Sequence, residues 1–365
     1  MHPGTTFEPA WNAPRIPFTR VIVCSALCVV ATVSNAIVLA TFVLERPIRK
    51  HVSNIIIVNL SISDFMVGCF SLPFFISEDI YGGWTHGEDI CKFHLAVSFL
   101  LTSMPVFLVI LLTLQRRLAM CEKTRYRALL GHKCATLVII AAWITLFAFF
   151  IFLSYAWPEI TDTHSVDYSY KCDMEYYSAF GFSLFMLVFE NAIPFIILVA
   201  LCMNLTLEIY KRSRRIGFQM KPKADGAASI SSNNLRKRAS CQDNPSVSCP
   251  RKNDLNQASS TSKESQSAAD DKRRPTEKHG DFARYRKAYI SLGVLVMFYL
   301  ICWLPYVAVN IISMACPLCV SFNTYLTTIV FLYSNSAMNP FLYALTNIHY
   351  RRGFINVLRL PKRWL

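Results

Sequence analysis

The chain has 365 residues, of which 53% are hydrophobic and 16% are charged, and its formal net charge is +14. Soluble domains carry roughly a quarter charged residues, so this composition excludes an ordinary soluble protein. The apolar residues gather into blocks of ~18 or more, which is long enough for a helix to cross a bilayer. We therefore expect most of the chain to lie in a membrane.

Seven apolar blocks follow one another, and each must be helical because lipid offers the backbone no hydrogen-bond partners. The expected spans are Phe18–Leu44, Val52–Ser77, Asp89–Met120, Lys133–Trp157, Tyr176–Tyr210, Tyr285–Ala315 and Phe322–Thr346. After them, Phe354 and Leu358 lie four residues apart among arginines, which predicts an amphipathic helix over His349–Leu360. The expected fold class is an all-α membrane protein, a seven-transmembrane helix bundle with a short amphipathic C-terminal helix.

Charge alternates between the connecting segments, and this pattern sets the expected orientation. Arginine and lysine follow the first, third, fifth and seventh spans, whereas the other connections are acidic, with Glu78, Asp79, Glu88 and Asp89 in the first of them. The positive-inside rule then places the N-terminus outside the cell and the C-terminus in the cytoplasm. Because the positive charge is explained in this way, we predict no nucleic-acid partner.

The expected organisation has five parts. They are an extracellular N-terminus (1–17), transmembrane helices one to five (18–211), a disordered cytoplasmic third loop (212–284), helices six and seven (285–346), and the amphipathic helix with a short tail (347–365). Ser240 and Thr276 follow basic residues in the third loop, a pattern typical of kinase sites that also recurs by chance.

Other classes of membrane protein lack support in the sequence. No internal repeat indicates a transporter, no polar or charged ring indicates a channel, and no nucleophile motif indicates an intramembrane protease. The last span contains no lysine, so it cannot hold a retinal Schiff base. A receptor is favoured over a transporter or an enzyme, and we predict no cofactor and no metal.

Short motifs stand on the spans in a fixed order. They are Asn35, Asn59-Leu60-Ser61-Ile62-Ser63-Asp64, Trp143, Pro194, Cys302-Trp303-Leu304-Pro305 and Asn335-Ser336-Ala337-Met338-Asn339-Pro340-Phe341-Leu342-Tyr343. Together they resemble the rhodopsin-like (class A) G-protein-coupled receptors, and the resemblance covers nearly all of the chain except the third inner loop.

The resemblance implies a polar hub in mid-membrane, where a carboxylate is expensive and usually functional. Its members would be Asn35, Asp64, Asn335, Ser336 and Asn339. Two interpretations remain open: a protonated acid hydrogen-bonded to the two asparagines Asn35 and Asn339, or a sodium-sensitive hub. Pro105 replaces a hydroxyl residue usual in this family, which argues against sodium.

Cysteines on the outer side predict two disulfides. Cys91, at the start of the third span, and Cys172, in the second outer loop, both face the oxidising compartment, where disulfides persist. Cys316 and Cys319 form a C-x-x-C in the third outer loop, for which we expect a small loop disulfide.

The inner end of the third span reads Gln115-Arg116-Arg117, where the family usually has an acid, arginine and tyrosine. The resemblance implies that Arg116 and Tyr343 serve coupling to a heterotrimeric G protein, of the inhibitory class. Because a neutral Gln115 replaces the acid, we expect a weaker restraint on Arg116.

The outer half of the fifth span contains an acid, Glu190, one turn before Pro194. This stretch is similar to the histamine receptors of the third and fourth subtypes, in which an acid here faces the amine ligand. Glu190 is therefore either a ligand contact or a structural acid bonded to a neighbouring helix. The amine-receptor branch places an aspartate in the third span where this chain has Ser98. The expected ligand site consists of Ser98, Glu190, Trp303, Tyr306 and Tyr333.

We expect a plasma-membrane receptor for a small extracellular ligand, an amine or imidazole-like cation held by Glu190, with a G protein and membrane lipid as partners. The rival hypothesis is a non-signalling seven-helix decoy that acts in a homo- or hetero-oligomer. It is motivated by the departures at Ser98, Pro105, Gln115 and Arg117.

Overall fold

The computed structural model describes residues 18–122, 126, 131–219, 290, 292–346 and 348–359. The expected N-terminal segment, most of the third loop with Ser240 and Thr276, and the start of the sixth span at Tyr285 lie outside these residues. The chain forms two compact units. The first, Met1–Asn204 with Ala288–Leu365, contains the helical bundle and every site discussed below; the second is Leu205–Lys287.

Among the described residues, six helices are long and apolar enough to cross a membrane. They are Phe18–Leu44, Val52–Tyr81, Glu88–Ala119, His132–Thr161, Phe180–Lys211 and Leu292–Ala315. The seventh helix of the bundle, α13 (Phe322–Thr346), has 25 residues but contains more polar side chains, among them Asn335 and Asn339. The predicted all-α bundle is confirmed, and α14 (Ile348–Arg359) is the predicted C-terminal helix.

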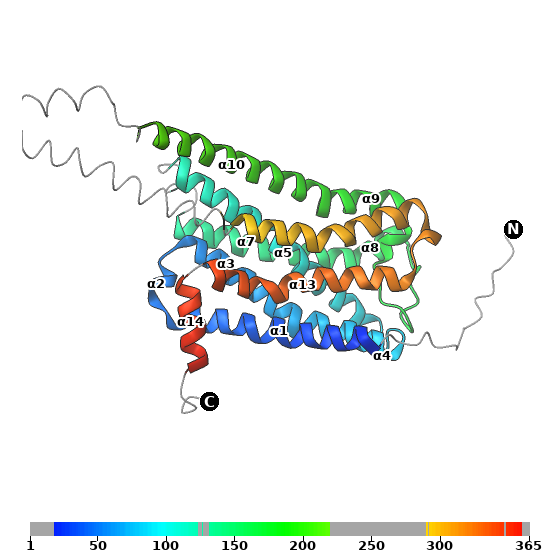
Figure 1. Ribbon diagram of the computed structural model, residues 1–365. Helices are drawn as coiled ribbons and strands as arrows, with labels where there is room; N and C mark the ends of the chain where they lie inside the picture. Colours follow the sequence, from blue (N-terminus) through cyan, green and yellow to red (C-terminus); the bar gives the residue numbers. More distant parts are fainter. Residues whose placement is uncertain are drawn as a thin grey trace, which may run out of the picture. The chain divides into compact units, whose positions relative to one another are not determined.

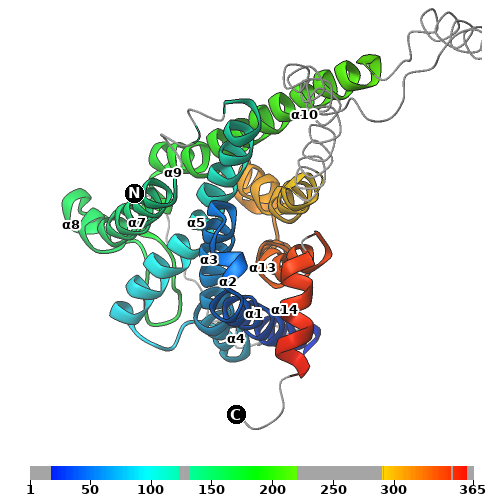
Figure 2. The same ribbon diagram turned by 90° about the vertical axis from the view of Figure 1, so that its left-hand side faces the viewer.

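The colours of the helices in Figures 1 and 2 follow the sequence from blue to red. The first, third and seventh spans are α1 (Phe18–Leu44), α5 (Glu88–Cys121) and α13. The second span comprises α3 (Val52–Met66), η1 (Val67–Ser71) and α4 (Leu72–Tyr81). The fourth span comprises α7 (His132–Ile151), η2 (Phe152–Ala156) and α8 (Trp157–Thr161). The fifth span comprises α9 (Phe180–Leu187), η4 (Val188–Ala192) and α10 (Ile193–Gln219). The sixth, Leu292–Ala315, is drawn in yellow to orange without a label. The short helices are α2 (Arg46–Arg49), η3 (Glu175–Ser178) and η5 (Pro317–Cys319).

The two ends of the bundle differ. Figure 1 shows α14 lying across one end, near α2, while α8 and the last turn of α4 lie at the other. Gly353 permits the contact of α14 with α1, because a Cβ added there would lie 2.0 Å from the Thr41 Cγ2. We call the two ends the α14 end and the disulfide end, after the Cys91–Cys172 bond described below.

Several boundaries differ from the prediction. Glu78 and Asp79 lie in α4 and not in a loop, because this helix continues to Tyr81 and ends at Gly82, whose φ of 71° favours glycine. The fifth span begins later than Tyr176, since Ala179 has an extended backbone that separates the short helix η3 from α9. At its other end α10 continues past the expected limit of Tyr210 to Gln219.

Three spans contain a five-residue π-helical stretch, η1, η2 and η4. A π-helical turn rotates the residues that follow it, and such turns are frequent at functional sites. The stretch η1 lies close to α1, because a Cβ on Gly68 would come within 2.6 Å of the Thr32 hydroxyl. The stretch η4 contains Glu190, and its backbone therefore determines where this acid lies.

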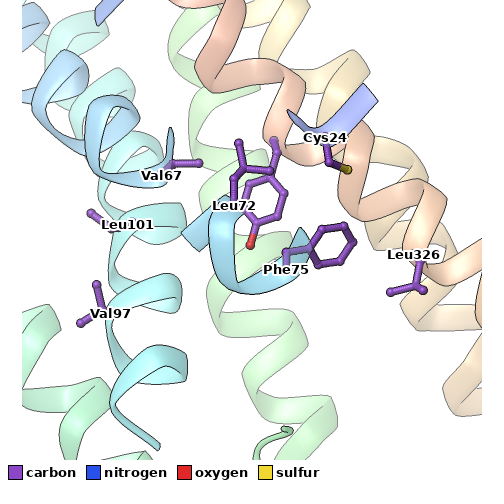
Figure 3. Packing of buried hydrophobic residues seen from close by; sticks show 8 residues of the cluster. Cys24, Val67, Leu72, Phe75, Val97, Leu101 and Leu326 are labelled. Carbon is purple, nitrogen blue, oxygen red and sulfur yellow. The ribbon is translucent and has the colours of Figure 1, made fainter. Parts of the chain in front are cut away.

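The apolar core lies between the spans. One cluster joins α1, η1, α4, α5 and α13 near the disulfide end and contains Cys24, Val67, Leu72, Phe75, Val97, Leu101, Leu326 and Tyr333 (Figure 3). A second joins α5, the fourth span, α9 and the residues around η3, and contains Ala96, Leu100, Phe150, Leu153, Met174, Tyr176 and Met186. The two clusters hold the helices that surround the cavities described next.

Candidate functional site

A covalent bond fixes the segment between the fourth and fifth spans. Cys91 in the first turn of α5 is joined to Cys172, with the two Cα atoms 5.5 Å apart. The Trp84 backbone N–H also donates to the Tyr170 carbonyl at 2.8 Å. Gly83 allows this approach, because a Cβ there would lie 2.7 Å from the same carbonyl oxygen. Residues 170–173 are thereby held against the mouth of a cavity.

The same segment is organised by two acids, the buried Glu175 and the half-buried Asp173. The Glu175 carboxylate accepts hydrogen bonds from the Ser165 backbone N–H at 2.7 Å and from the Ser165 hydroxyl at 2.8 Å. Lys171 lies 3.0 Å from the Asp173 carboxylate. Burial nevertheless raises the pKa of Asp173 above its usual value, against the opposing effect of Lys171. The segment therefore presents a partly compensated acid to the cavity.

The larger of two described cavities, about 700 Å³, lies among α1, α4, α5, α13 and residues 170–173. Its predicted members are Ser98, Tyr306 and Tyr333. The Ser98 hydroxyl lies 2.9 Å from the Ser71 hydroxyl of η1 and 3.5 Å from the His94 Nδ1. Ser98 is thus already engaged with Ser71 and His94.

The smaller cavity, about 60 Å³, contains Glu190 in its wall, together with Trp303 and Tyr306. The Glu190 Oε1 and the Trp303 Nε1 are both buried, and neither has a hydrogen-bond partner among the described residues. Asn191, the next residue of η4, likewise has a buried and unpartnered Oδ1. A carboxylate in such a place offers an acceptor to a cation or to a hydrogen-bond donor.

The predicted ligand site is therefore divided between two cavities and is not one pocket. Glu190 and Trp303 line the smaller cavity alone, Ser98 and Tyr333 line the larger one alone, and Tyr306 lines both. The two cavities adjoin, because they share five lining residues: Phe99, Thr102, Tyr177, Tyr306 and Leu332. The sequence could not reveal this division, which depends on how α5 and its aromatic side chains fill the space between them.

The predicted polar hub lies in the middle of the bundle. The Asn339 amide donates to the Asp64 Oδ2 at 2.8 Å, and the Asn35 amide donates to the Ser336 carbonyl at 3.0 Å. Asn335 is also buried. The remaining oxygens Asp64 Oδ1 and Asn35 Oδ1 are buried and accept no hydrogen bond from a described residue. The five residues thus lie on α1, α3 and α13, at the point where these helices contact one another.

At the α14 end, Gln115 joins two other segments. It accepts a hydrogen bond from the Ser53 hydroxyl at 2.8 Å, and its amide lies 3.2 Å from the Tyr126 hydroxyl. Its neighbour Arg116 is half-buried. Tyr343 is buried on α13, with its ring 6.1 Å from that of Tyr350 on α14. These residues lie at the opposite end from both cavities.

The predicted second disulfide is present between Cys316 and Cys319, where η5 connects the sixth span to α13. The backbone N–H of Cys319 donates to the Cys316 carbonyl at 3.0 Å, which closes the same turn.

Sequence reasoning missed an ion pair at the disulfide end. Arg20 in α1 donates from both Nε, at 2.5 Å, and Nη2 to the Asp79 carboxylate of α4, and its Nη1 lies 3.2 Å from the Asn323 Oδ1 of α13. These three residues line the larger cavity, as does Glu78. The available signal was the position of Arg20 inside an apolar block, which requires a partner.

Comparison with known proteins identifies the family. The family model described as "7 transmembrane receptor (rhodopsin family)" matches residues 34–343. The histamine H4 receptor of Homo sapiens is 26% identical over 94% of this chain and 94% of its own length. A D(5)-like dopamine receptor of Takifugu rubripes is 24% identical over 94% of this chain and 67% of its own. The 5-hydroxytryptamine receptor 6 of Mus musculus is 25% identical, with coverages of 96% and 74%.

This family consists of receptors and not of enzymes, in agreement with the expectation from the sequence. The family match spans most of the bundle, from α1 to the end of the α13 motif. The chain belongs to the rhodopsin family of seven-transmembrane G-protein-coupled receptors.

Proposed function

We propose that this receptor binds a small organic cation at Glu190 and activates a heterotrimeric G protein of the inhibitory class. The observation that carries the proposal is the buried Glu190 Oε1, which has no described hydrogen-bond partner and lies in the wall of a cavity. A buried carboxylate is costly unless a cation or donors compensate it, and a cationic ligand would do so. The similar proteins whose names refer to histamine, dopamine and 5-hydroxytryptamine make an amine the first class of ligand to test.

We also propose that the disulfide end faces the outside of the plasma membrane and the α14 end faces the cytoplasm. Basic residues around α2, Arg46, Arg49 and Lys50, support this orientation under the positive-inside rule. It gives both cavities access from the extracellular side, and it leaves Arg116 and Tyr343 at the end that would face the G protein.

The test is guanine-nucleotide exchange by a purified inhibitory-class heterotrimer, with the full chain in lipid nanodiscs and a panel of biogenic amines. At least one amine should stimulate exchange, and Glu190→Gln should weaken that response by about tenfold or more, since a charged partner is lost. Glu159→Gln, which changes an exposed acid on α8, is the matched control.

Equal responses of the Glu190→Gln and Glu159→Gln proteins would contradict the assignment of Glu190. Absence of exchange with every amine, and without ligand, in a protein that is folded by thermal melting would favour the non-signalling decoy.

A further inference from the structure

The charged groups around the larger cavity are not all compensated. Two cations, Arg20 and Lys171, and three acids, Glu78, Asp79 and Asp173, line it. Arg20 forms its ion pair with Asp79, and Lys171 forms its own with Asp173. Pairing these groups leaves one carboxylate, that of Glu78.

The Glu78 side chain accepts no hydrogen bond and forms no close ion pair within the described part of the chain, although its backbone carbonyl accepts the Gly83 N–H at 3.0 Å. Lys171 lines the same cavity, as do the two other acids, Asp173 and Asp79. Because the Lys171 side chain is 56% exposed and bound to Asp173, it neutralises Glu78 only in part.

The two cavities therefore have one uncompensated acid each. Glu190 lies in the smaller cavity, on the fifth span, and Glu78 lies in the larger one, on the second span. The shared wall, which contains Phe99, Tyr177 and Tyr306, separates them with aromatic side chains. Aromatic faces tolerate an alkyl chain and also attract cations.

We propose that the ligand is a dication with two separated cationic groups, such as a diamine, whose one end binds Glu190 and whose other end binds Glu78. The inference rests on the proposed function for the Glu190 end. The Glu78 end is independent of the proposed function. Glu78 supplies a second carboxylate from α4, whereas the described residues of α5 that line the larger cavity, among them Ser98, include no carboxylate.

The experiment is isothermal titration of the full chain in nanodiscs with straight-chain α,ω-diamines, from ethylenediamine to decamethylenediamine, and with the alkylmonoamines of the same lengths. Diamines within one range of chain lengths should bind about tenfold or more tighter than the monoamines of the same lengths, because their two ammonium groups reach both acids. Glu78→Gln should remove this advantage, and it should weaken monoamine binding less than Glu190→Gln does. Glu190→Gln should weaken both series.

Lys171→Gln provides a second variant with the opposite sign. The Asp173 carboxylate, which lines the larger cavity, then loses its cation, so diamine binding should strengthen. Glu159→Gln, at an exposed acid of α8 that lines neither of the two cavities, should change neither series.

The outcomes separate the two proposals. Amines that bind through Glu190 with no diamine advantage at any length, or with an advantage that survives Glu78→Gln, overturn the dication and leave the proposed function intact. A diamine advantage lost in Glu78→Gln but insensitive to Glu190→Gln supports the Glu78 site and overturns the proposed role of Glu190. Binding of no amine by any variant overturns both.

Discussion

The Asn339 amide of α13 donates a hydrogen bond to the Asp64 carboxylate of α3 at 2.8 Å, and both side chains are buried. This bond connects the second span to the seventh across 275 residues of sequence. Removing the Asn339 amide would leave the whole Asp64 carboxylate without a donor, because its Oδ1 already lacks a described partner.

We expect Asn339→Ala to lower the free energy of unfolding by about 1–3 kcal/mol, the usual effect of leaving a buried acceptor without its donor. Asn356→Ala is the control, because Asn356 donates to Glu45 at 3.3 Å in an exposed place, where such a bond contributes little. The measurement is thermal melting in nanodiscs. Asp64→Asn in the Asn339→Ala background should recover part of the lost stability. Equal melting temperatures of Asn339→Ala and Asn356→Ala would contradict the prediction.

A second prediction concerns the packing of α14 on α1. Gly353→Ala would place a methyl group 2.0 Å from the Thr41 Cγ2, so one helix must move. We expect a lower melting temperature and faster proteolysis at the α14 end. Combining it with Thr41→Ala should restore much of the stability, because the clashing Cγ2 is then absent. Gly293→Ala, where an added Cβ meets nothing within 4 Å, should have little steric effect.

The fold followed from hydropathy and motifs, whereas the shape of the site did not. The limits of α1 and α13 agree with the expected Phe18–Leu44 and Phe322–Thr346. The start of the fifth span was placed too early, at Tyr176, whereas the helix α9 begins at Phe180. An extended residue such as Ala179 leaves no mark in hydropathy.

The site residues were found through motifs, but their grouping was not. Glu78 was placed in a loop because acids usually end a span, and only the course of α4 brings it to a cavity. The π-helical stretch η4 also has no sequence pattern that periodicity could detect, although it sets the position of Glu190. Both features depend on contacts between distant segments.

The third prediction concerns basal activity. Gln115 bonds to Ser53 and Tyr126, and an aspartate in its place could accept hydrogen bonds from both hydroxyls while adding a negative charge beside Arg116. Charge-assisted bonds are stronger than neutral ones, so Gln115→Asp should hold this end more firmly and lower ligand-free nucleotide exchange. Gln115→Asn controls for the shorter side chain. Higher exchange in the aspartate variant would show that the predicted sign is wrong.

A fourth prediction follows from the loop at the disulfide end. Cys91→Ser or Cys172→Ser should sharply reduce surface expression, because the disulfide closes a long segment, with 81 residues separating its cysteines, and limits its unfolded states. Cys69→Ser, at an exposed free cysteine, is the control. Flow cytometry on intact cells gives the comparison. Normal expression of both disulfide variants would contradict a structural role for the bond.

The last prediction concerns Ser98, for which the resemblance to amine receptors implies an aspartate. A carboxylate introduced there would enter the larger cavity, next to Ser71 and His94. We expect Ser98→Asp to strengthen the binding of simple monoamines by about tenfold or more, because it adds a charged partner in a desolvated place. Ser98→Asn has nearly the same shape without the charge, so it should show no gain.

His94 could bind the new carboxylate and hide the effect, because its Nδ1 already lies 3.5 Å from the Ser98 hydroxyl. The double variant Ser98→Asp, His94→Phe keeps a ring among Phe74 and Trp84 and removes that competitor. Titrating both proteins with histamine, with and without Glu190→Gln, separates the contributions of the two acids. Monoamine binding that survives Glu190→Gln in the wild-type background would contradict the role of Glu190 as the amine partner. No gain from Ser98→Asp even without His94 would mean that the larger cavity does not bind these amines.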